Sequence, residues 1–120
     1  MTTLPVIDGE VHLERCATGR LREAYPAGAR DVEVRVSPAV TGEAMTRLLR
    51  VVTDAVSRQD PACRRVVCPV PEGDLGRIAA AEAAGFRYVV DVDLADEQLS
   101  LLVAEPEWVT GIDPGRVPET

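Results

Sequence analysis

Residues 41–46 have the composition of a helix start that could hold an anion: Thr41-Gly42-Glu43-Ala44-Met45-Thr46. Backbone N–H groups in the first turn of a helix lack partners within the helix, and the helix dipole makes that end positive. Such donors can bind a phosphate whatever the neighbouring side chains are, because they belong to the backbone. An ordinary capped helix start fits the same residues equally well.

Three titratable side chains elsewhere could exchange a proton with a substrate. Glu33 lies on an alternating segment and could act as a general base, although an exposed position on an edge strand is the ordinary interpretation. Asp74 precedes a helical segment and is favoured as its N-cap. His12, the single histidine, is more commonly a partly buried side chain than a catalytic one.

Charge and composition exclude several classes of function. The chain has 120 residues, with 13 basic against 20 acidic residues, and its net charge of -7 is wrong for a general binder of nucleic acids or anionic membranes. Every basic residue is arginine, which excludes lysine chemistry such as a Schiff base. We find no membrane-spanning run and no signal-peptide pattern, so we expect a cytoplasmic protein.

The three cysteines, Cys16, Cys63 and Cys68, form an odd-numbered set. Their spacing relative to one another and to His12 matches none of the common zinc sites. We therefore predict buried, unreactive thiols, and neither a disulfide framework nor a metal site.

Alternating apolar and polar residues predict strands in the first third of the chain. Residues 10–16, 20–25 and 31–36 each have this pattern and are separated by turn residues. Consecutive strands joined by short turns pair with one another. We therefore expect a meander of three antiparallel strands.

After residue 38 the apolar period changes from two to about 3.6, which predicts an amphipathic helix. Thr41 would be its N-cap, and Asp60-Pro61 would end it. The apolar stripe consists of Met45, Leu48, Leu49, Val52 and Val56.

The second half of the chain continues with a short apolar strand at residues 64–69. A second helix is predicted over 75–84, where Gly85 can take the left-handed conformation that closes a helix. Two antiparallel strands follow at 88–94 and 98–104.

The expected element order is therefore β-β-β-α-β-α-β-β, an α/β (α+β) domain at residues 1–105. Residues 106–120 are rich in proline and glycine and should form an extended tail. Trp108 and Tyr25 are large side chains with little core to enter, so we expect them at an interface, in a homodimer.

This order, with Val36-Ser37-Pro38 before one helix and Ala84-Gly85-Phe86-Arg87 closing the next, resembles the C-terminal half of the GNAT N-acetyltransferase superfamily. Residues 60–69, 84–86, 92–94 and 99–102 look most like the siderophore-type N-acyltransferases. Those enzymes move an acyl group from a thioester to a hydroxylated lysine amine. The resemblance implies a truncated GNAT-like fold with a mixed, mostly antiparallel sheet.

The resemblance also implies a donor, acetyl-CoA or another acyl-CoA. Its acyl-pantetheine arm would lie against the strand that ends at Val36, and its diphosphate would bind at residues 41–46. Gly42 matches a glycine of the family pattern. Thr41 and Ala44 stand where the family has a cation and a glycine, and Glu43 adds a negative charge beside the diphosphate.

Acyl transfer to an amine requires a base and an acid. The family often takes the acid from a tyrosine on the second helix, where this chain has Ala81. Its siderophore branch usually takes the base from a histidine on the strand that here carries Glu33 and Arg35. Asp74 stands where the family often has asparagine. Glu33 and Asp74 are thus the candidate catalytic residues.

Two functions remain open. The first is an N-acyltransferase that uses an acyl-CoA and a small-molecule amine. The alternative is a catalytically silent, dimeric module that binds or scaffolds; a metal or thiol site built from His12, Cys16 and a symmetry mate is a weaker idea. The first function requires the strand at residues 31–36 to part from the strand at 66–68, with a cleft over Gly42.

Overall fold

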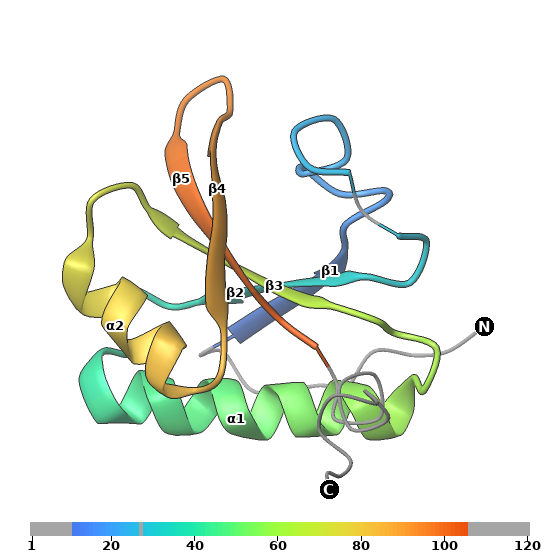
Figure 1. The fold of residues 1–120 in the computed structure, drawn as a ribbon, viewed down its shortest axis with the longest axis horizontal. Helices are drawn as coiled ribbons and strands as arrows, with labels where there is room; N and C mark the ends of the chain where they lie inside the picture. The colour runs from blue at the N-terminus through green and yellow to red at the C-terminus, as the bar shows by residue number, and fades with distance from the viewer. Residues whose placement is uncertain (1–10, 27, 106–120) are drawn as a thin grey trace, which may run out of the picture.

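A computed structural model describes residues 11–26 and 28–105 of the chain (Figure 1). The described chain forms five strands and two helices in the order β-β-α-β-α-β-β. The elements are β1 (Val11–Arg15), β2 (Val32–Val36), α1 (Gly42–Gln59), β3 (Val66–Pro71), α2 (Leu75–Ala83), β4 (Arg87–Asp93) and β5 (Gln98–Ala104).

The five strands form one mixed sheet in the spatial order β1-β2-β3-β5-β4. The β2 and β3 strands run parallel, and the other neighbouring pairs are antiparallel. This arrangement confirms the predicted mixed, mostly antiparallel sheet. Both helices pack on one face of the sheet, and residues 16–25 lie on the opposite side from α1 (Figure 1).

Residues 20–25 do not form the third strand that we predicted. They form consecutive turns, in which the Ala24 and Tyr25 N–H groups donate to the Leu21 carbonyl at 3.1 and 3.0 Å. Leu21 and Tyr25, four residues apart, therefore point the same way, and both are buried. The expected interface position of Tyr25 is wrong because its ring packs in the chain's own core; Trp108 lies outside the described residues.

The helix-covered face of the sheet carries the larger of two apolar clusters. The predicted stripe of α1 faces it, with Met45, Leu49, Val52 and Val56 fully buried and Leu48 partly buried. Burying each such side chain contributes about 1.5–3 kcal/mol. This cluster fixes α1 against the sheet and thereby fixes the position of its start.

The opposite face carries the second cluster, which the sheet shares with residues 16–25. Its buried members are Cys16, Leu21, Tyr25, Val67, Val92, Leu99, Leu101 and Val103. Because Leu21 and Tyr25 hold the turns against the sheet, the side chain of Arg20 is held above it as well.

Helix α1 ends at Asp60-Pro61, as predicted, and the Asp60 N–H donates to the Val56 carbonyl at 2.8 Å. The buried Asp60 carboxylate receives Arg15 Nη1 at 2.7 Å and Arg30 Nη2 at 2.9 Å. Burial raises the pKa of Asp60, but the hydrogen bonds from Arg30 and Arg15 outweigh it, so the pKa lies below its ordinary value. This contact ties the end of α1 to the first two strands.

Helix α2 has the predicted signals at both ends. The Asp74 carboxylate accepts from the Arg77 N–H at 3.2 Å, which confirms the N-cap interpretation. At the other end Gly85 has φ +98°, and the Phe86 N–H returns to the Ala81 carbonyl at 3.1 Å.

Within residues 11–26 and 28–105, no helix is long and apolar enough to cross a membrane. The tail that we predicted at residues 106–120 lies outside the described part of the chain.

Candidate functional site

The β2 and β3 strands begin as a parallel ladder and then part. Their register contains only Val32 opposite Val66 and Glu33 opposite Val67. However, β2 continues to Val36 and β3 continues as far as Pro71. The end of β2 therefore faces no paired residue of β3, which is the separation of strands that the acyl-thioester hypothesis requires.

Two prolines of β3 explain why the pairing stops. The Val32 N–H donates to the Arg65 carbonyl at 3.1 Å, so the backbone of Arg65 faces β2. Backbone groups along a strand turn to alternate sides, and the residues at 67, 69 and 71 therefore face β2 too. Pro69 and Pro71 have no N–H to donate to β2. The ladder cannot continue past Val67.

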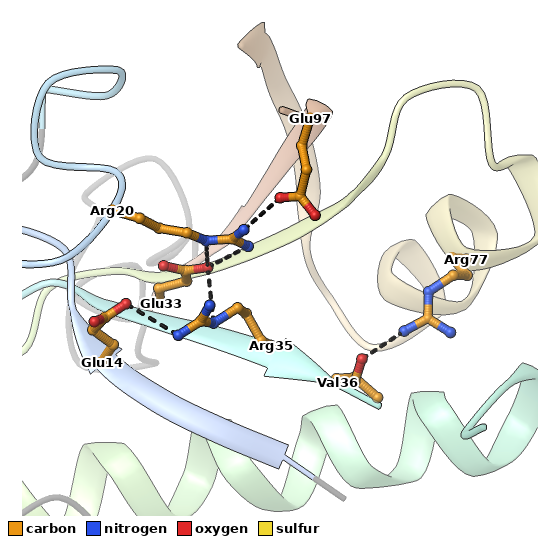
Figure 2. A network of polar contacts seen from close by, with 7 residues as sticks. All are labelled: Glu14, Arg20, Glu33, Arg35, Val36, Arg77 and Glu97. Carbon is orange, nitrogen blue, oxygen red and sulfur yellow. Dashed lines mark hydrogen bonds and ion pairs between the residues drawn. The ribbon is translucent and has the colours of Figure 1, made fainter. Parts of the chain in front are cut away.

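A cavity of about 1000 Å³ lies where the two strands part. Thr41 and Gly42 line it, so the cleft that we expected over Gly42 is present. It extends from the starts of both helices to a polar group formed by Arg20, Arg35 and Glu97. Figure 2 shows Arg35 near the end of β2, with Arg20 between Glu33 and Glu97.

The start of α1 is open towards this cavity. Thr41 occupies the N-cap position, but its side chain makes no capping hydrogen bond. Gly42 has φ +58°, and a Cβ atom there would meet nothing within 4 Å. Thr41, Gly42, Glu43 and Ala44 are all exposed. Backbone donors of the first turn can therefore reach a ligand without displacing a side chain.

The remaining residues of the predicted anion site have side chains that face elsewhere. Met45 is fully buried in the core. The Thr46 hydroxyl donates to the Ala80 carbonyl at 2.8 Å and so joins α1 to α2. The Glu43 carboxylate is 95% exposed and lies 3.7 Å from Arg47. Their side chains are therefore not part of the cavity, and the Met45 N–H already donates to the Thr41 carbonyl at 3.3 Å, so the first-turn donors that can reach a ligand precede Met45.

Arg77 is a cavity residue that the sequence analysis missed. From the first turn of α2 its Nη2 donates to the Val36 carbonyl at 3.1 Å (Figure 2). Its Nη1 donates to the Val40 carbonyl at 3.0 Å. Val36, predicted to bind the donor, also lines the cavity. The available signal was an arginine in the first turn of a helix that has no acidic residue there.

Glu33 is fully buried, in contrast to the exposed edge position that we considered. The β2 strand lies inside the sheet, and the Glu33 Oε2 atom receives Arg20 Nε at 2.9 Å and Arg20 Nη2 at 2.8 Å. Arg35 Nε is 3.5 Å from the same oxygen. Among the described residues Glu33 Oε1 has no hydrogen-bond partner. Only Oε1 is left to accept a proton.

Arg20 also pairs with Glu97, in the turn between β4 and β5 (Figure 2). These two residues line both the first cavity and a second one of about 720 Å³, which lies between residues 20–24 and 93–97. The Arg20–Glu97 pair therefore lies where the two cavities adjoin.

Asp74 and His12 both line the first cavity. The Asp74 carboxylate already serves as the cap of α2, through its bond to the Arg77 N–H. His12 is exposed on β1 and is not the partly buried histidine that we expected.

All three cysteines are buried and free, as predicted. Burial raises the pKa of Cys16 to about 12, of Cys63 to about 11 and of Cys68 to about 12. The thiols are therefore protonated near neutral pH and are poor nucleophiles. Across the described residues, His, Cys, Asp and Glu side chains form no group of three or more that could hold a metal ion.

The fold is similar to that of aminoglycoside acetyltransferase AAC(6')-Ib. Its structure with ribostamycin and coenzyme A matches with TM-score 0.68 and 16% identity, over 90% of this chain and 65% of that one. Its structure with kanamycin and coenzyme A matches with TM-score 0.68 and 16% identity, over 89% and 67%. An uncharacterized protein from Bacillus halodurans matches with TM-score 0.68 and 18% identity, over 79% and 51%.

At these identities the similarity concerns the fold alone, and it confirms the GNAT-like fold that the sequence resemblance implied. The chain spans between about half and two thirds of the length of these structures. No protein-family profile matches the sequence, and no curated protein matches it.

Proposed function

We propose that this chain binds an acyl-CoA between β2 and β3 and transfers the acyl group to a small-molecule amine. One observation carries the proposal: the two strands part after Glu33, and the cavity between them leads to the uncapped start of α1 at Gly42. Structures of the same fold that hold coenzyme A, or acetyl-CoA in a further complex of AAC(6')-Ib, support it.

The open edge of β2 offers a place for the pantetheine arm. Because the Val32 N–H faces β3, the backbone groups of Val34 and Val36 face the same side, where β3 has moved away. The amide groups of pantetheine can pair with this edge as an added strand would. The Val36 carbonyl can still accept one hydrogen bond, since Arg77 uses only one of its two lone pairs.

In this arrangement the diphosphate would accept hydrogen bonds from the first-turn N–H groups of α1, within residues 41–46. The thioester would lie further along the opening, nearer to Arg20 and Glu97. An amine acceptor could approach it from the second cavity, which adjoins the first at that pair.

The candidate acid and base groups for acyl transfer are already engaged in other contacts or have no proton to give. Glu33 is held by Arg20, and Asp74 caps α2. Ala81, at the position where the family often has a tyrosine, is buried and has no proton to give. These observations favour a second candidate function, a module that binds a thioester without turnover. In the enzyme proposal Glu33 Oε1 accepts the amine proton, which requires the buried carboxylate to become exposed first, because Glu33 lines neither cavity.

Two measurements separate these functions. Isothermal titration with acetyl-CoA and longer acyl-CoAs should show binding, and the bound ligand should raise the melting temperature. Release of the CoA thiol is then followed with a panel of amines that includes N-hydroxylated lysine side chains, the acceptors of siderophore-type enzymes. Binding with release supports the transferase, and binding without release supports a module that binds a thioester without turnover. No binding at millimolar donor contradicts both and favours a silent scaffolding module.

We also propose a homodimer. The β4 strand lies at the edge of the sheet and exposes three consecutive apolar side chains, Tyr88, Val89 and Val90. An apolar edge strand is a ready surface for pairing with a second chain. Sedimentation should give a dimer mass that Val89→Lys reduces to the monomer mass, and a monomeric wild-type protein would contradict the dimer alone.

A further inference from the structure

Arg77 occupies a position that is electrostatically unfavourable for a cation. It lies in the first turn of α2, and a cation at a helix N-terminus opposes the positive end of the dipole. The first turn itself contains no acidic residue; the N-cap carboxylate of Asp74 offsets part of the dipole and accepts the backbone N–H of Arg77, but it forms no ion pair with the guanidinium.

The same guanidinium reaches the start of the other helix. It donates to the Val40 carbonyl at 3.0 Å, and α1 begins two residues later at Gly42. The positive ends of two helices and one guanidinium thus meet at one cavity, in a chain whose net charge is -7.

The nearby carboxylates do not neutralise this charge. Glu43 is 95% exposed and forms an ion pair with Arg47, at 3.7 Å. Within the described part of the chain no carboxylate forms an ion pair with Arg77. Among the residues that the structure describes, its guanidinium bonds only to the carbonyls of Val36 and Val40, and three of the five N–H groups of an arginine remain.

We propose that Arg77 binds the diphosphate of the acyl-CoA donor and supplies, from α2, the cation that Thr41 lacks. The inference rests on the proposed function. The carbonyls of Val36 and Val40 hold the guanidinium in place. Its remaining N–H groups can donate to an anion that also accepts hydrogen bonds from the first turn of α1. The diphosphate is then bound between two helices.

The competing explanation is that Arg77 merely braces the end of β2 through its two carbonyl contacts. If Arg77 only braces the strand, its loss should weaken the affinity for every ligand of the cavity equally. If Arg77 binds the diphosphate, its loss should weaken the affinity only for ligands that carry a diphosphate. CoA and dephospho-CoA both contain the diphosphate, and pantetheine does not. These three molecules therefore separate the two explanations.

The test measures affinities of the three molecules by titration calorimetry for the wild type, Arg77→Met, Arg77→Lys and Arg58→Met. Arg58, in the last turn of α1 and 79% exposed, controls for the loss of one positive charge. We expect Arg77→Met to weaken CoA and dephospho-CoA about 10-fold to 100-fold and pantetheine not at all. Arg77→Lys should lose less because it keeps the charge, and Arg58→Met should change nothing.

Four results would overturn the proposal. An equal loss for pantetheine would make Arg77 a brace. An equal loss of CoA affinity in Arg77→Lys and Arg77→Met would also make Arg77 a brace, because lysine keeps the charge but cannot bond to both carbonyls. Unchanged CoA affinity in Arg77→Met would show that Arg77 does not bind the diphosphate, and the proposed function would still stand. If the wild type binds neither CoA nor pantetheine, the proposed function fails and this inference fails with it.

Discussion

The two sides of β3 differ along most of its length. Towards β5 all six residues are paired, from Val66 opposite Ala104 to Pro71 opposite Leu99. Towards β2 only Val66 and Val67 are in register. One strand is therefore a fully bonded member of the sheet on one side and a wall of the cavity on the other.

The difference shows that the effect of a proline in a strand depends on which neighbour its nitrogen faces. Pro69 and Pro71 face β2, so they remove donors from that side and leave the ladder to β5 intact. Val70, between them, keeps the N–H that faces β5. A Pro-x-Pro pattern in an interior strand thus separates it from one neighbour only.

Val70→Pro disrupts the pairing of β3 with β5 and should have the largest effect on stability. It removes a donor to β5 and leaves a buried carbonyl without its partner. We expect the free energy of unfolding to fall by on the order of 3 kcal/mol, measured by urea denaturation. Val70→Ala is the control for the lost side chain. A cost no larger than that of alanine would show that this backbone nitrogen does not face β5.

Gly42→Val tests the start of α1, where the cavity between β2 and β3 would hold the diphosphate. At φ +58° a β-branched residue is strained, so we expect a loss of about 1–2 kcal/mol in stability together with loss of CoA binding. Gly73→Val is the matched control, because Gly73 has φ +85° and equally open surroundings but does not line the cavity. It should cost similar stability and retain CoA binding. Retained binding in Gly42→Val would place the diphosphate elsewhere.

Replacing both prolines by valine should extend the pairing of β3 with β2. The double variant Pro69→Val with Pro71→Val restores two donors towards β2, and each new hydrogen bond stabilises by about 1 kcal/mol. We expect slow hydrogen exchange at both new amides and weaker CoA binding. Either single variant should have about half the effect. Rapid exchange at both amides would contradict the proline explanation of the open edge.

Acid should weaken the contact of Asp60, at the end of α1, with Arg15 and Arg30, and this is the smallest expected effect. The pKa of Asp60 is lowered in the folded chain, so its contribution is complete above its ordinary value of 3.8 and is lost as the pH falls through the folded value. We expect Asp60→Asn to flatten the fall in stability below about pH 4. Asp54→Asn, which removes an exposed pair, should leave that fall unchanged, and an equal change in both variants would refute the assignment.

Signals contained within one element were read correctly from the sequence. The stripe from Met45 to Val56, the cap at Asp74 and the closure at Gly85 each depend on residues a few positions apart. Local spacing fixes such features, because the interacting groups lie within one or two helical turns. The elements that position the candidate site could therefore be predicted.

Features that depend on distant partners could not be predicted in this way. Alternation at 20–25 suggested a strand, but burial of Leu21 and Tyr25 against the sheet favoured turns. Glu33 looked exposed because its partner Arg20 comes from those same turns. Arg77 gained its role only when α2 packed beside the end of β2.

The burial of the three cysteines has a chemical consequence for any thioester that enters the cavity. Cys68 lies on β3 itself, yet its thiol keeps its proton up to a pKa of about 12. A protonated thiol does not exchange with an activated acyl group, since transthioesterification requires the thiolate. An acyl chain held beside β3 would therefore not be diverted onto the protein's own sulfur.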